Sequence, residues 1–315
     1  MKQQIAQMEP WFDEREAEAV YAYMQSGGWV TEFRKCRELE RMIADYTAAK
    51  HCSLMPNGTV SLSCALLAFG LEPGDEVIVP DFTMVATANA VHLLGAKVVF
   101  ADVERRTACI DFAEMEKAVT ERTKAVIVVS SNGRYPDRFE EIIAFCEERG
   151  LWLLEDAAQA LGSRCADRHL GTLGHIGSFS FSSPKIITMG QGGALVTDDD
   201  DLFQRIQKLR NFGREKGGAD NYVTMGWNFK FTDIQAVIGI EQMKKLEWRV
   251  ERKKEIGRLY EERLRDLEPV TLFPTRYEEN TPWFMEILAE KRDALHAFLD
   301  QRGIGSRLFY PALHS

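Results

Sequence analysis

The sequence lacks the features that mark membrane, secreted and metal-binding proteins. A membrane-spanning helix needs about 18 consecutive apolar residues, and no apolar run in this sequence is that long. Residues 1–10 also lack the apolar core that a secretory signal has. The six cysteines form no C-x-x-C pair, which favours reduced thiols packed as small hydrophobic groups. His169 and His175 are six residues apart and no H-E-x-x-H motif occurs, so we expect no metal site. These absences predict a soluble, cytoplasmic protein without a membrane partner.

Basic residues are also in the minority. The 315 residues include 39 Lys and Arg against 48 Asp and Glu, a formal net charge of −9. This balance argues against a nucleic-acid partner bound through an overall basic field, but a local basic pocket for a phosphorylated small molecule is still possible. The composition, 45% hydrophobic and 28% charged, is that of a globular protein, and the length suggests roughly two domains.

Short apolar runs alternate with helical segments in the first two thirds of the chain. The pattern predicts strands at 76–80, 97–102, 125–130 and 151–156, and helices at 57–69, 83–94 and 139–149. Near-continuous apolar strands separated by helices are typical of a sheet that is covered on both faces. The sequence therefore predicts an α/β fold with a mainly parallel sheet.

The pattern changes after residue 197. An apolar helix that starts near Thr232 continues into a charged stretch, 244–266, which we interpret as a solvated helix linking two domains. A strand at 283–288, a helix at 291–301 and a second strand at 307–310 then predict a small α+β unit.

The start of the helix at 57–69 is a possible phosphate site. The free N–H groups of a helix N-terminus attract anions. Gly58 allows close approach to the backbone, and Thr59 offers a hydroxyl. The triplet Asn57-Gly58-Thr59 is also an ordinary helix cap, so both interpretations stay open.

Two further residues follow strand ends. Asp156 ends an apolar strand, where ligands gather in open α/β sheets, and a buried carboxylate there needs a cation such as a protonated ring nitrogen. A cap of the next helix is the alternative role. Lys185 follows an alternating Ser/Phe strand among uncharged neighbours, which fits an amine that forms an imine, although a surface lysine is the common case. The glycines at 190–193 do not form a G-x-G-x-x-G dinucleotide motif.

A phosphate site, a partner for a ring cation and an imine-forming lysine are together what pyridoxal phosphate (PLP) needs. Six sequence motifs also occur in one order along the chain, and they are MPNGT (55–59), GDEVIVP (74–80), EDAAQ (155–159), FSFSSPK (179–185), MGWNFKFTDIQ (225–235) and YPALH (310–314). From about Gly27 onward, the sequence resembles the PLP-dependent nucleotide-sugar aminotransferases of the DegT/StrS type, which have the fold type I architecture.

The resemblance implies roles for individual residues. Lys185 would form the imine with the cofactor and move the proton during transamination. Asp156 would pair with the ring nitrogen, and Gln159 would bond to the phenolic oxygen. The phosphate would be held by residues at both the helix start and the next strand, namely Gly58, Thr59 and Ser180. Asn228 resembles an asparagine that reaches the phosphate of the neighbouring subunit's cofactor, which implies a homodimer with shared active sites.

Two positions depart from the family pattern. Many members place an aromatic residue against the cofactor ring where this chain has Met84, and a thioether can also pack on a ring. Phe82 is the second candidate for stacking. The loop at 130–134 lacks the family's usual histidine, and we assign it no role.

The resemblance implies that the enzyme transfers an amino group from glutamate to a keto-deoxysugar linked to a nucleotide diphosphate, with the ketone at C3 or C4. A lysine at position 185 favours this reaction over PLP-dependent sugar dehydration, for which the family places a histidine. A different PLP reaction on the same fold stays open, and so does a non-catalytic nucleotide-binding or regulatory dimer. A diphosphate needs cations, and the candidates near the motifs are Arg34, Arg210, Arg214 and Lys230.

The motifs divide the chain unequally. We expect a large PLP-binding domain at 1–233, and a linking helix with a small C-terminal domain at 234–315. Family members usually continue beyond the motif at 310–314, so we expect the small domain to be short here.

Overall fold

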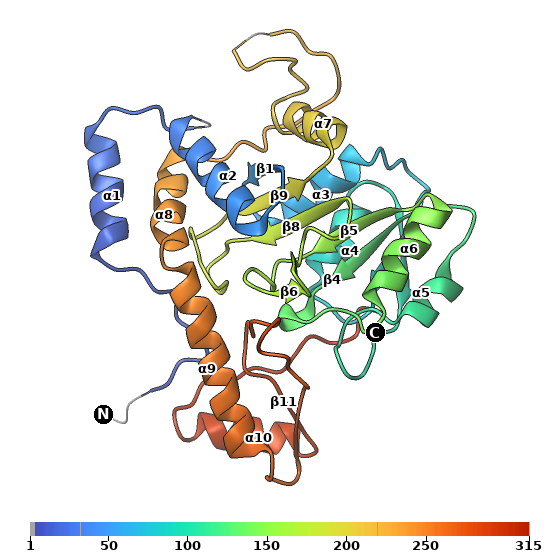
Figure 1. Cartoon of the computed structure of the whole chain (residues 1–315), viewed down its shortest axis with the longest axis vertical. Coiled ribbons are helices and arrows are strands. Elements are labelled where there is room, and N and C mark those ends of the chain that lie inside the picture. Colours follow the sequence, from blue (N-terminus) through green and yellow to red (C-terminus); the bar gives the residue numbers. More distant parts are fainter. Residues whose placement is uncertain (1–3, 32, 219, 315) are drawn as a thin grey trace.

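The computed structural model describes residues 4–31, 33–218 and 220–314. Figure 1 shows a central sheet with helices on both sides and a C-terminal part at one end. The helices are α1 (Glu14–Gln25), α2 (Arg34–Thr47), α3 (Gly58–Ala68), α4 (Ala86–His92), α5 (Phe112–Ala118), α6 (Phe139–Arg149), α7 (Asp200–Arg210), α8 (Asp233–Met243), α9 (Leu246–Leu264), α10 (Arg292–Asp300) and the short 3-10 helix η1 (Ser131–Gly133). The strands are β1 (His51–Met55), β2 (Glu76–Pro80), β3 (Lys97–Ala101), β4 (Thr123–Val129), β5 (Trp152–Asp156), β6 (Arg164–Cys165), β7 (Arg168–His169), β8 (Ile176–Ser180), β9 (Gly193–Thr197), β10 (Val270–Leu272) and β11 (Ile287–Ala289).

The main sheet has seven strands in the order β1-β9-β8-β5-β4-β2-β3. Neighbouring strands from β8 to β3 pair in parallel, whereas β9 is antiparallel to both β1 and β8. The strand β1 therefore points the same way as β8 and the other parallel strands. The predicted α/β fold with a mainly parallel sheet is confirmed.

The strands contain near-continuous apolar runs because both faces of the sheet are buried. On β2, Ile78 contacts one core while Val77 and Val79 contact the other. The first core also contains residues of α2, α5, α6 and α8, and the second contains residues of α3, α4 and α7. Side chains alternate between the faces of a strand, so near-continuous apolar runs are what two helical layers require.

The C-terminal part differs from its predicted secondary structure. Its helix is close to prediction as α10, but β11 begins four residues later than the predicted strand, and residues 307–310 form no strand. The backbone of Phe284 is instead bonded to the side chain of Asn132. Phe309 stacks on Phe82 with ring centroids 4.9 Å apart. Contacts with the main sheet region therefore replace the expected strand pairing.

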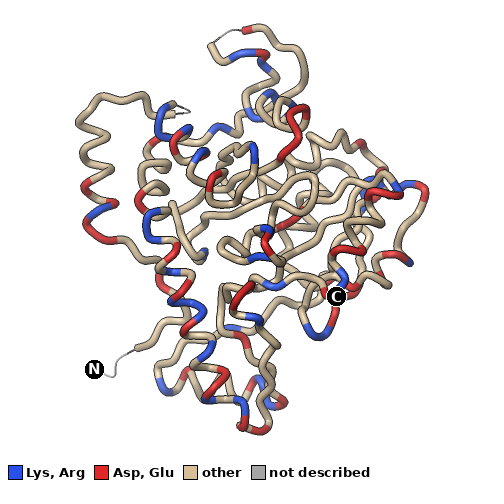
Figure 2. Tube along the Cα trace, viewed as in Figure 1, with Lys and Arg blue, Asp and Glu red and all other residues tan. Residues whose placement is uncertain are grey.

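The helix α9 connects the sheet region with this C-terminal part (Figure 1). It has buried contacts at Leu246, Val250 and Gly257, and Figure 2 shows acidic and basic residues along its length. This agrees with the prediction of a charged, largely solvated helix. In the described part of the chain, no helix combines the length and the apolar character needed to cross a membrane.

Candidate active site

The carboxyl ends of the co-directional strands lie along one edge of the sheet. Asp156 ends β5, and Ser180 ends the neighbouring strand β8, while β1 leads through a short turn to Gly58 at the start of α3. Strands that run in one direction bring their ends to the same edge, where ligands bind in open α/β sheets. The topology thus brings together the start of α3, Asp156 and the end of the strand that leads to Lys185.

The start of α3 lies against the end of β8. Asn57 caps the helix, because its side-chain oxygen accepts a hydrogen bond from the backbone N–H of Val60 at 2.9 Å. A Cβ atom added at Gly58 would lie 2.9 Å from the Cβ of Ser180, so only glycine allows this approach. Thr59 is exposed beside it. Free N–H groups of a helix start and adjacent hydroxyls are suited to hold a phosphate.

Asp156 is buried, with 6% of its surface exposed. Its Oδ2 accepts a hydrogen bond from Thr87 Oγ1 at 2.8 Å, and its Oδ1 accepts one from the backbone N–H of Ala158 at 3.2 Å. Burial raises the pKa of this carboxyl, whereas both hydrogen bonds and the charge of Lys185 act to lower it. A cation placed against the carboxylate would offset its burial.

Lys185 follows β8 in a turn in which its own backbone N–H donates to the carbonyl of Ser182 at 3.0 Å. Burial lowers the pKa of its amine to about 8, although the charge of Asp156 opposes that shift. The Nζ atom lies 4.0 Å from the centre of the Trp283 ring. A lowered pKa makes the neutral, nucleophilic form of the amine more available near neutral pH.

Gln159 is buried near the same site, and its orientation is fixed. Its Oε1 accepts a hydrogen bond from the backbone N–H of Asn132 at 2.8 Å. Since the oxygen is engaged in this way, the nitrogen end of the amide is the one left to act as a donor. Gln159 can therefore donate a hydrogen bond to an anionic oxygen.

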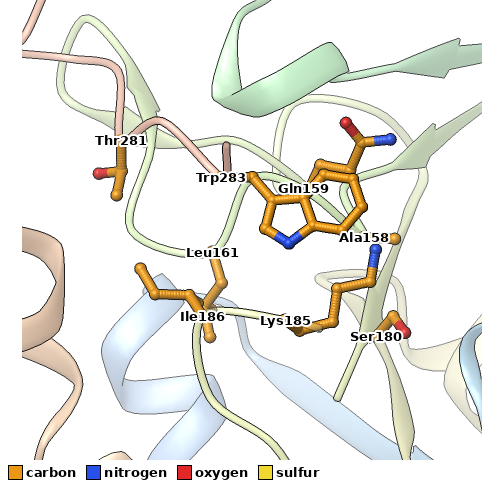
Figure 3. Close-up of a pocket in the computed structure, with 8 residues that line it drawn as sticks. All are labelled: Ala158, Gln159, Leu161, Ser180, Lys185, Ile186, Thr281 and Trp283. Atoms are coloured by element: carbon orange, nitrogen blue, oxygen red, sulfur yellow. The ribbon is translucent and has the colours of Figure 1, made fainter. Parts of the chain in front are cut away.

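Three of the predicted side chains line one small pocket (Figure 3). Gln159, Ser180 and Lys185 line it together with Thr281 and Trp283, and the other lining residues are Ala158, Leu161 and Ile186. In Figure 3 the indole of Trp283 lies next to the Lys185 amine. Gln159, Ser180 and Lys185 thus meet in one cavity at the strand ends, and the C-terminal part contributes two of its lining residues, Thr281 and Trp283.

Several contributors were not predicted from the sequence. Thr87 lies in the first turn of α4, and Asn132 lies in the loop that lacks the family's usual histidine. Trp283 and Thr281 belong to a segment that was predicted in part as a strand. Each contacts a residue far away in the sequence, so no local pattern indicates it.

The other predicted cofactor contacts are not in the lining of this pocket. Gly58, Thr59 and Asp156 lie at the neighbouring element ends described above, whereas Met84 and Asn228 are exposed. Met84 is 44% exposed in the loop before α4, and its sulfur accepts a hydrogen bond from the backbone N–H of Ala86 at 3.1 Å. Asn228 is exposed and forms an isolated β-bridge with Asn211. Phe82, the second stacking candidate, is engaged with Phe309.

The candidate cations differ in their surroundings. Arg210 is buried and donates to Glu40 at 2.8 Å and to the carbonyl of Leu54 at 3.2 Å, so it braces the fold. Arg214 pairs with Asp220 at 2.7 Å, and Lys230 Nζ lies 4.1 Å from the centre of the Phe212 ring. The carbon Cζ of Arg34 lies 5.3 Å from the centre of the adjacent Phe33 ring.

Comparison with known proteins identifies the family of the chain. The sequence profile described as the DegT/DnrJ/EryC1/StrS aminotransferase family matches residues 10–315. The chain is similar to the GDP-perosamine synthase of Vibrio cholerae, with 32% identity over 90% of this chain and 79% of that protein. The Caulobacter vibrioides GDP-perosamine synthase is 36% identical over 88% of this chain and 76% of its own. The crystal structure of the aminotransferase TlmJ from Streptoalloteichus hindustanus superposes with a TM-score of 0.93 and 30% identity, covering 98% of this chain and 86% of that one. The chain belongs to the DegT/DnrJ/EryC1/StrS aminotransferase family.

Proposed function

We propose that this enzyme is a PLP-dependent aminotransferase that moves an amino group from glutamate to a keto-deoxysugar linked to a nucleotide diphosphate. The observation that carries the proposal is the meeting of Lys185 and Asp156 at one buried edge of the sheet. A half-buried amine with a lowered pKa and a buried carboxylate are what the chemistry of this cofactor needs.

The residues present fit PLP at each of its polar groups. The close approach of Gly58 to Ser180, with Thr59 beside them, suits the phosphate. Asp156 suits a protonated ring nitrogen, and the amide nitrogen of Gln159 suits the phenolic oxygen. When bound, PLP withdraws electrons from the carbon that carries the exchanged amino group.

The chain itself would supply the proton transfers and the environment. With a pKa near 8, the Lys185 amine can both accept and return a proton near neutral pH. Thr87 and Ala158 hold the Asp156 carboxylate, which favours its charged form against a ring cation. Leu161, Ile186 and Trp283 give the cavity apolar walls that limit the entry of water.

The substrate class rests on the relatives. Two similar proteins are GDP-perosamine synthases, so we propose a nucleotide-diphosphate sugar and place a GDP-linked 4-keto-6-deoxyhexose first. Arg34, Arg214 and Lys230 are the proposed partners of its diphosphate. Arg210 is set aside, since it is engaged with Glu40 inside the fold.

We also propose a homodimer with shared active sites. The segment 211–228 has large exposed apolar side chains, among them Tyr222, Met225 and Trp227, and exposed apolar patches of this kind mark interfaces. In such a dimer, Asn228 would reach the partner's cofactor phosphate, and Met84 would lie near the cofactor ring. Within one chain we assign 1–233 to the cofactor domain and 234–315 to the linking helix and small domain.

A half-reaction assay tests the proposal. Purified protein is loaded with PLP and mixed with glutamate, and the release of 2-oxoglutarate is measured together with the change in the visible spectrum. A panel of nucleotide keto-sugars is then added to find which one returns the spectrum to its starting form. Lys185→Ala is expected to abolish both steps, whereas Lys244→Ala, at an exposed lysine paired with Glu241, should leave them intact. Unchanged transamination by Lys185→Ala would refute the assignment.

A further inference from the structure

The segment 280–286, here called the clamp segment, reaches the active site from the C-terminal part. Its first residues bond to two loops of the main sheet region. Thr281 donates from its backbone N–H to Ser163 Oγ at 2.9 Å and from its hydroxyl to the carbonyl of Gly162 at 2.8 Å. Asn280 donates to the carbonyl of Gly133 at 3.1 Å. The clamp segment is therefore fixed on the same side of the sheet as the catalytic pocket.

Trp283 contacts the backbone of Pro184, which precedes Lys185, and also the Lys185 amine itself. Its indole N–H donates to the carbonyl of Pro184 at 2.6 Å, and the centre of its ring lies 4.0 Å from Lys185 Nζ. Its own carbonyl accepts a hydrogen bond from Lys253 of α9 at 2.7 Å. A lysine side chain has many rotamers, so a fixed aromatic face beside the amine restricts them.

Phe284 is linked to Gln159 through Asn132. The Asn132 side chain makes two hydrogen bonds with the backbone of Phe284, accepting from its N–H at 2.6 Å and donating to its carbonyl at 2.8 Å. Asn132 has the positive φ of 52° that asparagine tolerates, and this backbone turn directs its N–H to Gln159 Oε1 at 2.8 Å. One end of the clamp segment thus sets the orientation of the Gln159 amide.

Arg134 and Glu286 complete the attachment with a buried ion pair at 2.8 Å. We propose that the clamp segment positions two functional side chains of the site, Lys185 and Gln159. Trp283 holds the Lys185 amine against its ring, and Phe284 holds the Gln159 amide through Asn132. Trp283 and Asn132 are positioning residues, since they act through Lys185 and Gln159. This inference rests on the proposed function for its chemical meaning, but its contacts belong to the chain alone.

The first test measures the pKa of Lys185 in the cofactor-free protein. Competitive acetylation with acetic anhydride across a pH series, read by mass spectrometry, reports the titration of the Lys185 amine. Asp156 is the charge that acts on this amine, and it is retained in every variant. Trp283→Phe and Trp283→Leu open similar space, but only phenylalanine keeps an aromatic face for a cation.

We expect Lys185 to titrate about one pH unit higher in Trp283→Phe than in Trp283→Leu, because a ring face favours the ammonium form. Trp248→Leu is the matched control, since that tryptophan is 61% exposed on α9, and it should titrate as the parent protein does. Equal titration in the phenylalanine and leucine variants would overturn the role of Trp283. If circular dichroism shows that the leucine variant is unfolded, Trp283→Met takes its place in the comparison.

The second test measures hydrogen exchange in Asn132→Asp. Aspartate keeps the shape and tolerates positive φ, but it replaces the N–H donor to Phe284 with an oxygen. Peptides covering 280–286 and 157–163 should both exchange faster than in the parent protein, and unchanged exchange in both would overturn the link to Gln159. Both tests use cofactor-free protein, so failure to bind PLP would refute the proposed function while leaving the clamp testable. Conversely, PLP binding with equal titration of the Trp283 variants would refute the clamp alone.

Discussion

The sheet edge and the segment 211–228 hold their side chains in opposite ways. At the sheet edge, Asp156 is 6% and Gln159 is 8% exposed, and each is fixed by named hydrogen bonds. In the segment 211–228, Tyr222 is 58% and Met225 is 75% exposed, and Figure 1 shows its described residues, 211–218 and 220–228, extending beyond α7. The chemical groups are therefore positioned within one chain, whereas the exposed apolar groups gain stability only when another surface covers them.

After the loss of Lys185 itself, the largest effect should come from the carboxylate at the sheet edge. Asp156→Asn removes the charge that keeps a ring nitrogen protonated but preserves the shape of the side chain. We expect the rate of transamination to fall at least about a hundredfold, the usual cost of losing one preorganised electrostatic group. Steady-state kinetics with glutamate would measure it. Asp102→Asn, at an exposed carboxylate, is the control, and a loss of less than about tenfold in Asp156→Asn would contradict the role of Asp156.

Thr87→Val should have a smaller effect, because it removes a partner of Asp156 rather than the charge itself. A hydrogen bond to a charged group is commonly worth about 1.5–3 kcal/mol. Because the charge itself is retained, we expect a loss near the lower end of that range, at least about tenfold in rate. The Thr87 hydrogen bond lowers the pKa of Asp156. Without it the carboxylate accepts a proton at higher pH, and the acid limb of the pH–rate profile should move upward. Thr271→Val, on the exposed middle of β10, should leave the profile unchanged.

The difference between Asp156 and Thr87 also shows what the sequence can predict. Asp156 and Lys185 follow strands that are visible as apolar runs, so their places at strand ends could be predicted locally. Thr87 meets Asp156 across 69 residues, and Trp283 meets Pro184 across 99. Such pairings depend on how the elements pack, which a single sequence does not display.

The prediction of a strand at 283–288 was wrong for residues 283–286, for a related reason. Its residues are apolar and suit a strand, but the side chain of Asn132 takes both backbone bonding groups of Phe284. Burial against the active site, rather than pairing with a neighbouring strand, accounts for the apolar pattern of Trp283 and Phe284. The fold class and the positions of Asp156 and Lys185 after strand ends could thus be predicted, whereas the C-terminal lining of the pocket could not.

An experiment with mixed subunits would test directly whether the segment 211–228 contributes Asn228 to the partner's site. If Asn228 serves the partner's site, mixing Lys185→Ala with Asn228→Asp subunits creates one intact site in each mixed dimer. Random exchange makes about half of the dimers mixed, so about a quarter of the parent activity should return. Native mass spectrometry would verify exchange. Confirmed mixed dimers without recovered activity would show that Asn228 does not act across the interface.

The smallest expected effect concerns stability and compares a half-buried lysine with an exposed one. The pKa of Lys185 is lowered from 10.5 to about 8 in the folded protein, chiefly by burial. Between these pH values the unfolded chain binds a proton that the folded chain does not, so the free energy of unfolding should rise with pH through this window. Urea unfolding of the cofactor-free protein would measure the slope. In Lys185→Met this rise in the free energy of unfolding with pH should disappear. Lys216→Met, in the exposed segment, should still show it. Equal slopes for the parent protein and Lys185→Met would mean that the amine stays in contact with water, which would place Lys185 with the exposed segment rather than with the buried sheet edge.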